Sequence, residues 1–263
     1  MQPRPLHIII AVLILIAAGI ALWFVLSRPS PVGPGGSATS TPSGAEGDVP
    51  ATLQDNGQYH EITAHYPAQT PLKATAGATA DIVASRVMKE FVEQEIARFK
   101  DNNVDMLTAE DISIIGLGGE RKYVLDIEYK VYESPDTVSY VFSMFADTLG
   151  AHPNGYYRTY TFDKESGEGL HLDDIFGTPD YLEVLSMLSR QALAAKLDEF
   201  GYDKEYLEAG TTAFADNFQN FYLEGDNFVV LFPPYQVGPW VIGTQTAELP
   251  RAELGNTLKE AYR

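Results

Sequence analysis

The stretch that decides the fold runs from residue 122 to residue 148 and reads KYVLDIEYKVYESPDTVSYVFSMFADT. In its first half large apolar or aromatic side chains alternate with polar ones, which is the period of a half-buried strand. The alternating residues are Tyr123, Leu125, Ile127, Tyr129 and Val131. The four residues 133–136, ESPD, are turn formers. The sequence therefore predicts a β-hairpin with strands at 122–132 and 137–148.

The segments before the hairpin predict one helix and two short strands. Across residues 80–100 the apolar side chains recur at steps of three and four, which is typical of an amphipathic helix. Residues 61–66 are a strand candidate that ends at Pro67, and residues 111–117 are another. The folded part is expected to begin near Tyr59.

The segments after the hairpin predict one or two strands within 156–172, and then helices at 179–200 and 204–216. A second hairpin joins strands at 218–223 and 227–232 across a Glu-Gly-Asp turn, and a last strand at 244–249 precedes a short helix. Helices and hairpins are thus segregated along the chain. The predicted fold class is α+β, with antiparallel hairpins and segregated helices, and not a doubly wound parallel sheet.

Residues 8–26 form a run of 19 uncharged, almost wholly apolar residues. As a helix this run spans roughly 28 Å, close to the hydrocarbon thickness of a bilayer. The alternative is a cleaved signal peptide, whose apolar core has about 7 to 15 residues before a small-residue cleavage site. Here the small residues 17–19 are followed by further large apolar ones. We therefore expect residues 1–28 to hold an uncleaved anchor with one transmembrane helix.

A linker and a strongly acidic folded part follow the apolar run. Sixteen of the 22 residues 29–50 are Pro, Gly, Ser or Thr, which predicts a flexible linker. Residues 29–263 contain 16 Lys and Arg against 36 Asp and Glu, a net charge of −20. Only about seven residues precede the apolar run, so we expect the folded part to lie outside the cytoplasm, held at the cell membrane. The acidity argues against a nucleic-acid partner; it suits a basic partner, or serves solubility alone.

The first candidate site is the turn LGAHPNG, residues 149–155, between two predicted strands. In the functional interpretation, His152 and Asn154 are polar groups of a ligand site. Tyr156 and Tyr157 follow directly, and tyrosine rings suit stacking on a sugar or a protein partner. In the structural interpretation the turn is simply ordered and the tyrosines belong to the core. The residues alone leave both interpretations open.

The second candidate site is the loop FPPYQVGPWVIG, residues 232–243. Three prolines restrict its backbone, two glycines allow tight bends, and Tyr235 and Trp240 add large surfaces. A rigid aromatic loop suits recognition because little entropy is lost on binding. The alternative is that both rings fill the core. If the loop is a recognition surface, at least one ring should be exposed beside the turn that contains His152.

At these two places the sequence resembles a known family. The stretches GAHPNGYYRTYTFDKESGEGLHLDDIF, 150–176, and FYLEGDNFVVLFPPYQVGPWVIGTQTAELPRAEL, 221–254, look like a domain shared by RsiV-type anti-sigma factors and PdaC-type peptidoglycan deacetylases. The segment from ITAHYPAQTPL, 62–72, through the predicted helix is similar to the smaller domain that precedes it in those proteins. The resemblance covers about residues 58–255.

This resemblance implies an extracytoplasmic α+β module made of a smaller PdaC-like domain, 51–148, and an RsiV-like domain, 149–263. In the anti-sigma branch such a module binds lysozyme, and in the deacetylase branch it accompanies a catalytic domain. The chain departs from both patterns. About seven residues stand where a sigma-binding segment is expected, and the H-x-x-x-H zinc motif of the deacetylase domain is not found.

The sequence contains few signs of catalytic chemistry. The chain has no cysteine and lacks the P-loop, the dinucleotide-binding and the G-x-S-x-G motifs. His152 and His171 could bind a metal with Asp173 or Asp174 only if the fold brings them together, and we expect no metal or cofactor. The predicted function is a binding or sensing module for a lysozyme-like protein or a cell-wall glycan. A carboxylate-dependent peptidoglycan hydrolase and a structural envelope scaffold are the alternatives.

Overall fold

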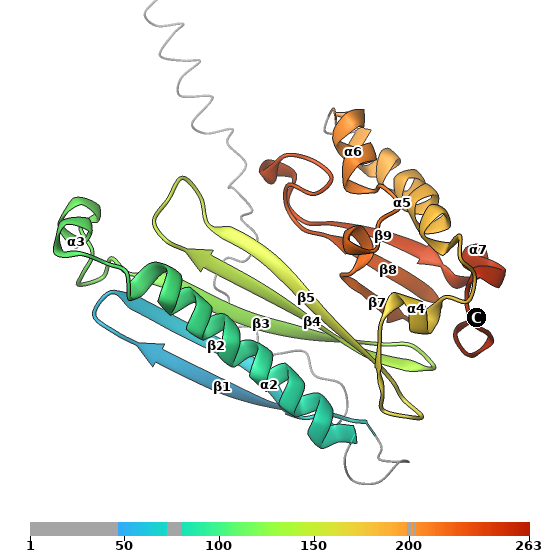
Figure 1. Ribbon diagram of the computed structural model, residues 1–263, viewed down its shortest axis with the longest axis horizontal. Helices are drawn as coiled ribbons and strands as arrows, with labels where there is room; N and C mark the ends of the chain where they lie inside the picture. The colour runs from blue at the N-terminus through green and yellow to red at the C-terminus, as the bar shows by residue number, and fades with distance from the viewer. Residues whose placement is uncertain (1–46, 73–79, 199–200, 202) are drawn as a thin grey trace, which may run out of the picture. The chain divides into compact units, whose positions relative to one another are not determined.

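A computed structural model describes residues 47–72, 80–198, 201 and 203–263 of the 263-residue chain (Figure 1). Among these residues, no helix combines the length and the apolarity that crossing a bilayer requires. The predicted transmembrane helix, 8–26, and all but the last four residues of the predicted linker, 29–50, lie outside the described residues.

The first part of the described chain is a six-stranded sheet whose strands lie side by side in chain order (Figure 1). The strands are β1 (Val49–Asn56), β2 (His60–Gln69), β3 (Tyr123–Glu133), β4 (Thr137–Asp147), β5 (Asn154–Asp163) and β6 (Gly169–Leu170). All neighbours are antiparallel except β2 and β3, which run parallel. Together with a second sheet and several helices, this sheet makes the fold α+β, as predicted.

The hairpin predicted at the centre of the sheet is confirmed as β3 and β4, which pair from Val124 with Asp147 to Glu133 with Val138. The Ser134 hydroxyl shapes the turn because it accepts hydrogen bonds from the backbone N–H groups of Asp136 (3.2 Å) and Thr137 (3.0 Å). The alternating residues of β3 point to one buried face, as their period predicted.

Helix α2 (Ala80–Phe99) covers that face of the sheet (Figure 1). Its fully buried side chains Met88 and Val92 belong to the same core as Ile62, Ile127 and Phe142. The sequence predicted this helix between two strands, as observed, but it did not predict that these strands, β2 and β3, pair in parallel. Parallel neighbours need such a crossover, since a tight turn cannot join them.

The strand predicted at 111–117 is also wrong, because this segment forms helix α3 (Ala109–Ile115), after a π-helical turn η1 (Lys100–Val104). The Thr108 hydroxyl accepts from the Asp111 N–H (3.1 Å), and the Asp111 carboxylate accepts from the Thr108 N–H (3.0 Å). This capping box starts the helix, and Gly116 ends it with φ 72°. Its isoleucines favoured a strand, but the caps decided the local structure.

The folded part begins at β1, ten residues before the expected start near Tyr59. Strand β2 also continues through Pro67, where a strand end was predicted. Pro67 pairs with Pro50 of β1 beside a register irregularity, while β2 pairs with β3 only as far as Ala64. A proline at this position removes no hydrogen bond that β3 needs.

The second part is a three-stranded antiparallel sheet of β7 (Phe221–Glu224), β8 (Asn227–Phe232) and β9 (Gln245–Pro250). The helices of this part are α4 (Leu172–Ile175), α5 (Tyr181–Asp198), α6 (Lys204–Gly210) and α7 (Arg251–Leu254). Short 3-10 turns accompany them: η2 (Ala215–Phe218), η3 (Trp240–Ile242), η4 (Gly255–Thr257) and η5 (Glu260–Tyr262). The predicted β7–β8 hairpin is confirmed, but the helix predicted at 204–216 ends at Gly210.

The two sheets contact each other directly. Val141 of β4 packs in one buried cluster with Tyr222 of β7 and with Val229 and Leu231 of β8. The Thr159 hydroxyl of β5 donates to the Gln219 carbonyl (3.3 Å) and accepts from the Phe221 N–H (3.1 Å). Strand β5 pairs with β4 along its whole length, so the first sheet runs across the boundary predicted between residues 148 and 149.

Candidate functional site

The structure brings three of the predicted site residues together from two loops far apart in sequence. His152 lies in the loop between β4 and β5, and Tyr235 and Trp240 lie in the loop between β8 and β9. The Nε2 atom of His152 is 2.8 Å from the Tyr235 hydroxyl. The imidazole stacks on Trp240, with ring centroids 4.6 Å apart and an interplanar angle of 21°. We call His152, Tyr235 and Trp240 the aromatic cluster.

Two hydrogen bonds fix the orientation of the His152 imidazole and determine which ring nitrogen carries the proton in its neutral form. Its Nδ1 atom is 2.9 Å from the Pro153 carbonyl, which can only accept. In the neutral ring the proton therefore sits on Nδ1, and Nε2 accepts from the Tyr235 hydroxyl. His152 is thereby fixed in orientation between a backbone carbonyl and a phenol.

Exposure in the aromatic cluster meets the expectation for a recognition surface. Tyr235 is 50% exposed, Trp240 is partly exposed, and the adjacent Val241 is 81% exposed. The indole Nε1 atom of Trp240 is itself buried and has no hydrogen-bond partner among the described residues. The prediction that at least one ring is exposed beside the turn at residues 149–155 is confirmed by Tyr235.

Backbone strain concentrates at the same place. Leu149 (φ 58°) and Tyr235 (φ 73°) are the only non-glycine residues with positive φ in the described chain, and they lie in the two loops that form the cluster. Such conformations cost of order 1–3 kcal/mol each and persist where the surrounding structure enforces them. They are typical of functional sites, although the strain by itself names no function.

The loop that carries Tyr235 is anchored by the next two residues. The Gln236 side-chain amide donates to the carbonyls of Gly210 (3.0 Å) and Asn217 (2.9 Å). Val237 is 1% exposed and packs in the core of the second sheet. The exposed ring of Tyr235 is therefore carried by a loop with a fixed base, which reduces the entropy lost when a ligand binds.

The other three predicted site residues, Asn154, Tyr156 and Tyr157, lie outside the aromatic cluster. Asn154 is exposed at the start of β5. Tyr157 faces the second sheet, where its hydroxyl accepts from Thr244 (2.9 Å). Tyr156 points to the opposite face because successive strand residues alternate. Its hydroxyl donates to Glu95 of α2 (3.2 Å), and burial, with the nearby Glu95 carboxylate, raises the Tyr156 pKa well above its usual range.

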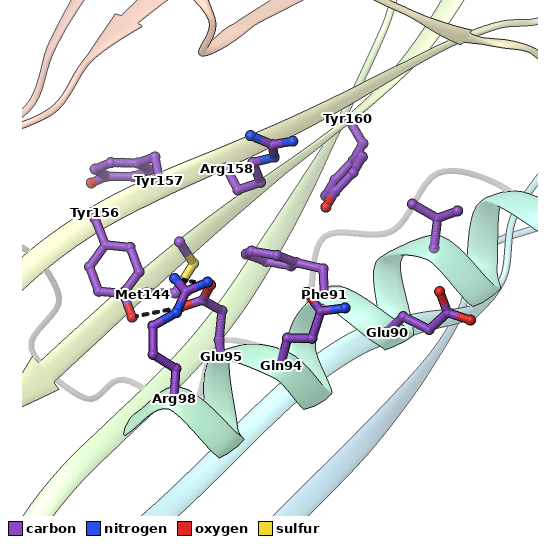
Figure 2. A pocket seen from close by; sticks show the side chains of 11 residues that line it. Glu90, Phe91, Gln94, Glu95, Arg98, Met144, Tyr156, Tyr157, Arg158 and Tyr160 are labelled. Carbon is purple, nitrogen blue, oxygen red and sulfur yellow. Dashed lines mark hydrogen bonds and ion pairs between the residues drawn. The ribbon is translucent and has the colours of Figure 1, made fainter. Parts of the chain in front are cut away.

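Tyr156 lines a cavity of about 510 Å³ between α2 and β5 (Figure 2). From α2, Gln94, Glu95 and Arg98 face it, and from β5, Arg158 and Tyr160 face it. The Arg98 guanidinium donates to Glu95 at 2.8 Å. Sequence reasoning missed the α2 residues. Their three- and four-residue spacing within the predicted helix was a signal, but only the fold shows that this helix face opposes β5.

A pair of carboxyl groups lies on the other face of the first sheet. Asp126 and Glu128 are two apart on β3, so they share one face. Burial raises the pKa of both groups; the charge of Glu61 raises the Asp126 pKa further, whereas His65 lowers both. Neither residue lines either of the two cavities beside α2. The pair is therefore separate from the groups that line those cavities.

The predicted possibility of a metal site at His152 and His171 is not supported by the described residues. His171 is the residue that precedes α4, and its N–H donates to the Asp174 carboxylate (2.8 Å). His152 is instead engaged in the aromatic cluster. Within the described ranges no three His, Asp or Glu side chains are placed to hold a metal ion together.

Comparison with protein families matches residues 173–252 to a family described as a protein of unknown function, DUF3298. The match includes α5 and the second sheet with Tyr235 and Trp240, whereas His152 and the cavity beside α2 lie before it. Two solved structures have a similar fold. A DUF3298 family protein from Pseudomonas aeruginosa has a TM-score of 0.57 at 14% identity, covering 82% of this chain and 96% of that one. A DUF3298 member from Bacteroides fragilis has a TM-score of 0.50 at 22% identity, covering 84% and 96%.

Two curated proteins are similar in sequence. The peptidoglycan-N-acetylmuramic acid deacetylase PdaC of Bacillus subtilis is 27% identical over 214 residues, which are 81% of this chain and 42% of PdaC. The esterase Rv3036c of Mycobacterium tuberculosis is 24% identical over 120 residues, 45% of this chain and 51% of the esterase. The chain thus spans about half the length of these relatives. The matches support a DUF3298-type module with distant similarity to PdaC.

Proposed function

We propose that this protein is a binding or sensing module of the cell envelope, which recognises a protein or a cell-wall glycan through the aromatic cluster. The observation that carries the proposal is the meeting of His152, Tyr235 and Trp240 from two loops, with Tyr235 half exposed on a strained backbone. Tyrosine and tryptophan dominate binding hot spots because they bury much area at little entropic cost.

Two classes of ligand fit this surface. The resemblance to RsiV-type proteins supports a lysozyme-like partner, and the net charge of −20 over residues 29–263 would steer a basic protein toward the module. The similarity to a deacetylase named for peptidoglycan supports a cell-wall glycan, whose sugar faces stack on exposed aromatic rings. In either case the ligand is recognised without a cofactor, by side chains already held in place.

The same proposal places the module outside the cytoplasm, tethered to the cell membrane by residues 8–26. We expect the full-length protein to stay in the membrane fraction after a carbonate wash, because a 19-residue apolar helix is not released by high pH. Immunoblotting of the pellet and the supernatant measures this. Recovery of a soluble form that begins near residue 28 would show instead that the segment is a cleaved signal peptide.

The binding surface is tested by Tyr235→Ala in the full chain. Calorimetry with a c-type lysozyme and co-sedimentation with peptidoglycan sacculi should show binding weakened by at least about 2 kcal/mol for the ligand that is recognised. The free energy of unfolding should change by less than about 1 kcal/mol, because an exposed ring leaves no core cavity.

Val241→Ala is the matched control, since Val241 is the more exposed apolar residue of the same loop and lies outside the cluster. It should bind like the unchanged protein. If the unchanged protein binds neither ligand, or if Tyr235→Ala binds as well as Val241→Ala, the cluster is not the recognition surface. Failure of binding altogether would favour the structural scaffold.

A carboxylate-dependent hydrolase is a second candidate because Asp126 and Glu128 share one face and both have a raised pKa. This function predicts release of soluble fragments from purified sacculi, and its loss in Asp126→Asn and Glu128→Gln. Chromatography of the supernatant measures the release. Unchanged sacculi after long incubation with the unmodified chain would exclude this activity.

A further inference from the structure

The cavity beside α2 continues into a second one, so that a longer groove follows the helix. The second cavity, of about 750 Å³, is lined mainly by the β5–β6 hairpin and shares Val87, Arg158 and Tyr160 with the first. Lining residues of α2 extend from Val83 to Arg98, a distance of about 22 Å along the helix. A groove of this length suits an extended ligand with several units.

The two halves of the groove differ in chemistry. The first offers hydrogen-bonding side chains beside aromatic rings, namely Glu90, Gln94, Glu95 and Arg98 of α2 with Tyr156 and Tyr160 of β5. Glu95 is 4% exposed, and its carboxylate is held by Tyr156 and Arg98, so this half has a fixed polar wall. The second half is more apolar, with Val83, Phe162 and Leu170. Aromatic and planar polar groups together are suited to sugar rings, which have apolar faces and hydroxyl edges.

Arg158 lies where the two halves meet. Its guanidinium carbon is 5.4 Å from the centroid of the Tyr160 ring, and its side chain is exposed. In the described part of the chain no carboxylate lies within 4.0 Å of it, whereas Arg86, Lys89 and Arg98 of α2 each pair with a glutamate. Arg158 lines both cavities, and Figure 2 shows it on β5 between Tyr157 and Tyr160.

An arginine without a carboxylate partner is notable in a chain with a net charge of −18. The Tyr160 side chain orients the guanidinium through a cation–π contact and a hydrogen bond, and the other N–H donors of the guanidinium remain available to a ligand. The ligand group that best matches these donors is a carboxylate, because the two planar groups form paired hydrogen bonds. Arg158 would thus select an acidic ligand against the repulsion of the surrounding protein.

We propose that the groove between α2 and β5 is a second binding site, separate from the aromatic cluster, for a short glycan that carries a carboxylate. Arg158 binds the carboxylate, Tyr160 and Tyr156 lie against sugar rings, and Gln94 and Glu90 bind hydroxyl or amide groups. This inference deepens the glycan branch of the proposed function, but it rests on different residues and is tested separately.

The test compares two soluble probes that differ by the carboxylate. The disaccharide of N-acetylglucosamine and N-acetylmuramic acid carries a lactyl carboxylate, and chitobiose does not. Calorimetry or ligand-observed NMR with the full chain should show at least about 10-fold tighter binding of the acidic disaccharide, which is the usual worth of a charge-assisted hydrogen bond. Arg158→Gln should abolish this preference, and raising the salt concentration should reduce it.

Arg121→Gln is the matched control, because Arg121 is an exposed arginine that lines neither cavity. Arg121→Gln and Tyr235→Ala should both keep the preference. Equal affinity for the two probes, a preference that survives Arg158→Gln, or no saturable binding of either probe would overturn the proposal. Saturable binding of an acidic peptide, without binding of either disaccharide, would also overturn the proposal. Because Tyr235→Ala tests the aromatic cluster, failure at one site is distinguishable from failure at the other.

Discussion

Replacing Arg251 with alanine is expected to lower the free energy of unfolding by about 3 kcal/mol or more. Arg251 is 6% exposed. Its guanidinium donates to the Asp136 carboxylate (2.6 Å), to the Tyr262 carbonyl (2.8 Å) and to the Arg263 carbonyl (3.2 Å). It therefore joins the β3–β4 turn of the first sheet to the C-terminal residues.

Alanine would leave several groups without their donor, and unpaired buried polar groups cost about 1–3 kcal/mol each. Asp136 is about one third exposed, so water can compensate for part of its loss. Asp136→Asn should therefore cost only about 1 kcal/mol. Arg263→Ala is a control for the loss of an exposed arginine and should change stability by less than about 0.5 kcal/mol.

Urea denaturation of the full chain and the variants measures these differences. A cost below about 1 kcal/mol for Arg251→Ala would show that the contact between the β3–β4 turn and the C-terminus contributes little. An equal cost for Asp136→Asn and Arg251→Ala would place the whole effect in the ion pair.

Replacing Gly210 with alanine is expected to lower stability by about 3 kcal/mol and to displace the loop of the aromatic cluster. A Cβ atom built at Gly210 would lie 1.8 Å from the Gln236 carbonyl oxygen and 2.6 Å from its carbon. These are backbone atoms, so the clash cannot be relieved by rotating a side chain. Overpacking of this kind costs about 1–3 kcal/mol, and more where the backbone must move.

The clash would displace Gln236, which is next to Tyr235 in the chain. Gly210→Ala should therefore also weaken ligand binding at the aromatic cluster. Gly150→Ala is the matched control, because nothing lies within 4 Å of its added Cβ and it sits in the loop of His152. Thermal unfolding measures stability. The fluorescence of Trp240, in a Trp23→Phe background, reports the loop because Trp240 stacks on His152. An unchanged spectrum and melting temperature in Gly210→Ala would contradict the expected clash.

The local pattern of the sequence determined the elements that carry their own signal. The alternation at 123–131 and the turn at 133–136 predicted the β3–β4 hairpin, and the three- and four-residue steps predicted α2. For the β8–β9 loop, the interpretation as a recognition surface predicted that at least one of the Tyr235 and Trp240 rings is exposed, and Tyr235 is exposed. These features depend on residues that are close together in the sequence, so the sequence alone is sufficient to predict them.

Other features were not evident from the periodicity of the sequence, and tertiary structure decided two of them. The parallel pairing of β2 with β3 depends on how α2 crosses the sheet, which no local period encodes. The helix at 109–115 was missed for a local reason instead, because its caps Thr108, Asp111 and Gly116 outweigh its β-branched residues. Strand β1 is stabilised by its pairing with β2, and its own sequence, within the predicted linker and just after it, has little strand character.

The candidate sites divide in the same way. The sequence determined which residue types stand in the two loops, and it identified His152, Tyr235 and Trp240 one by one. Only the fold placed His152 beside residues 83 and 88 positions later, and only the fold set Glu95 and Arg98 of α2 across a groove from Arg158. The physical reason is that a site joins side chains through space, and the packing that brings them together is a property of the whole chain.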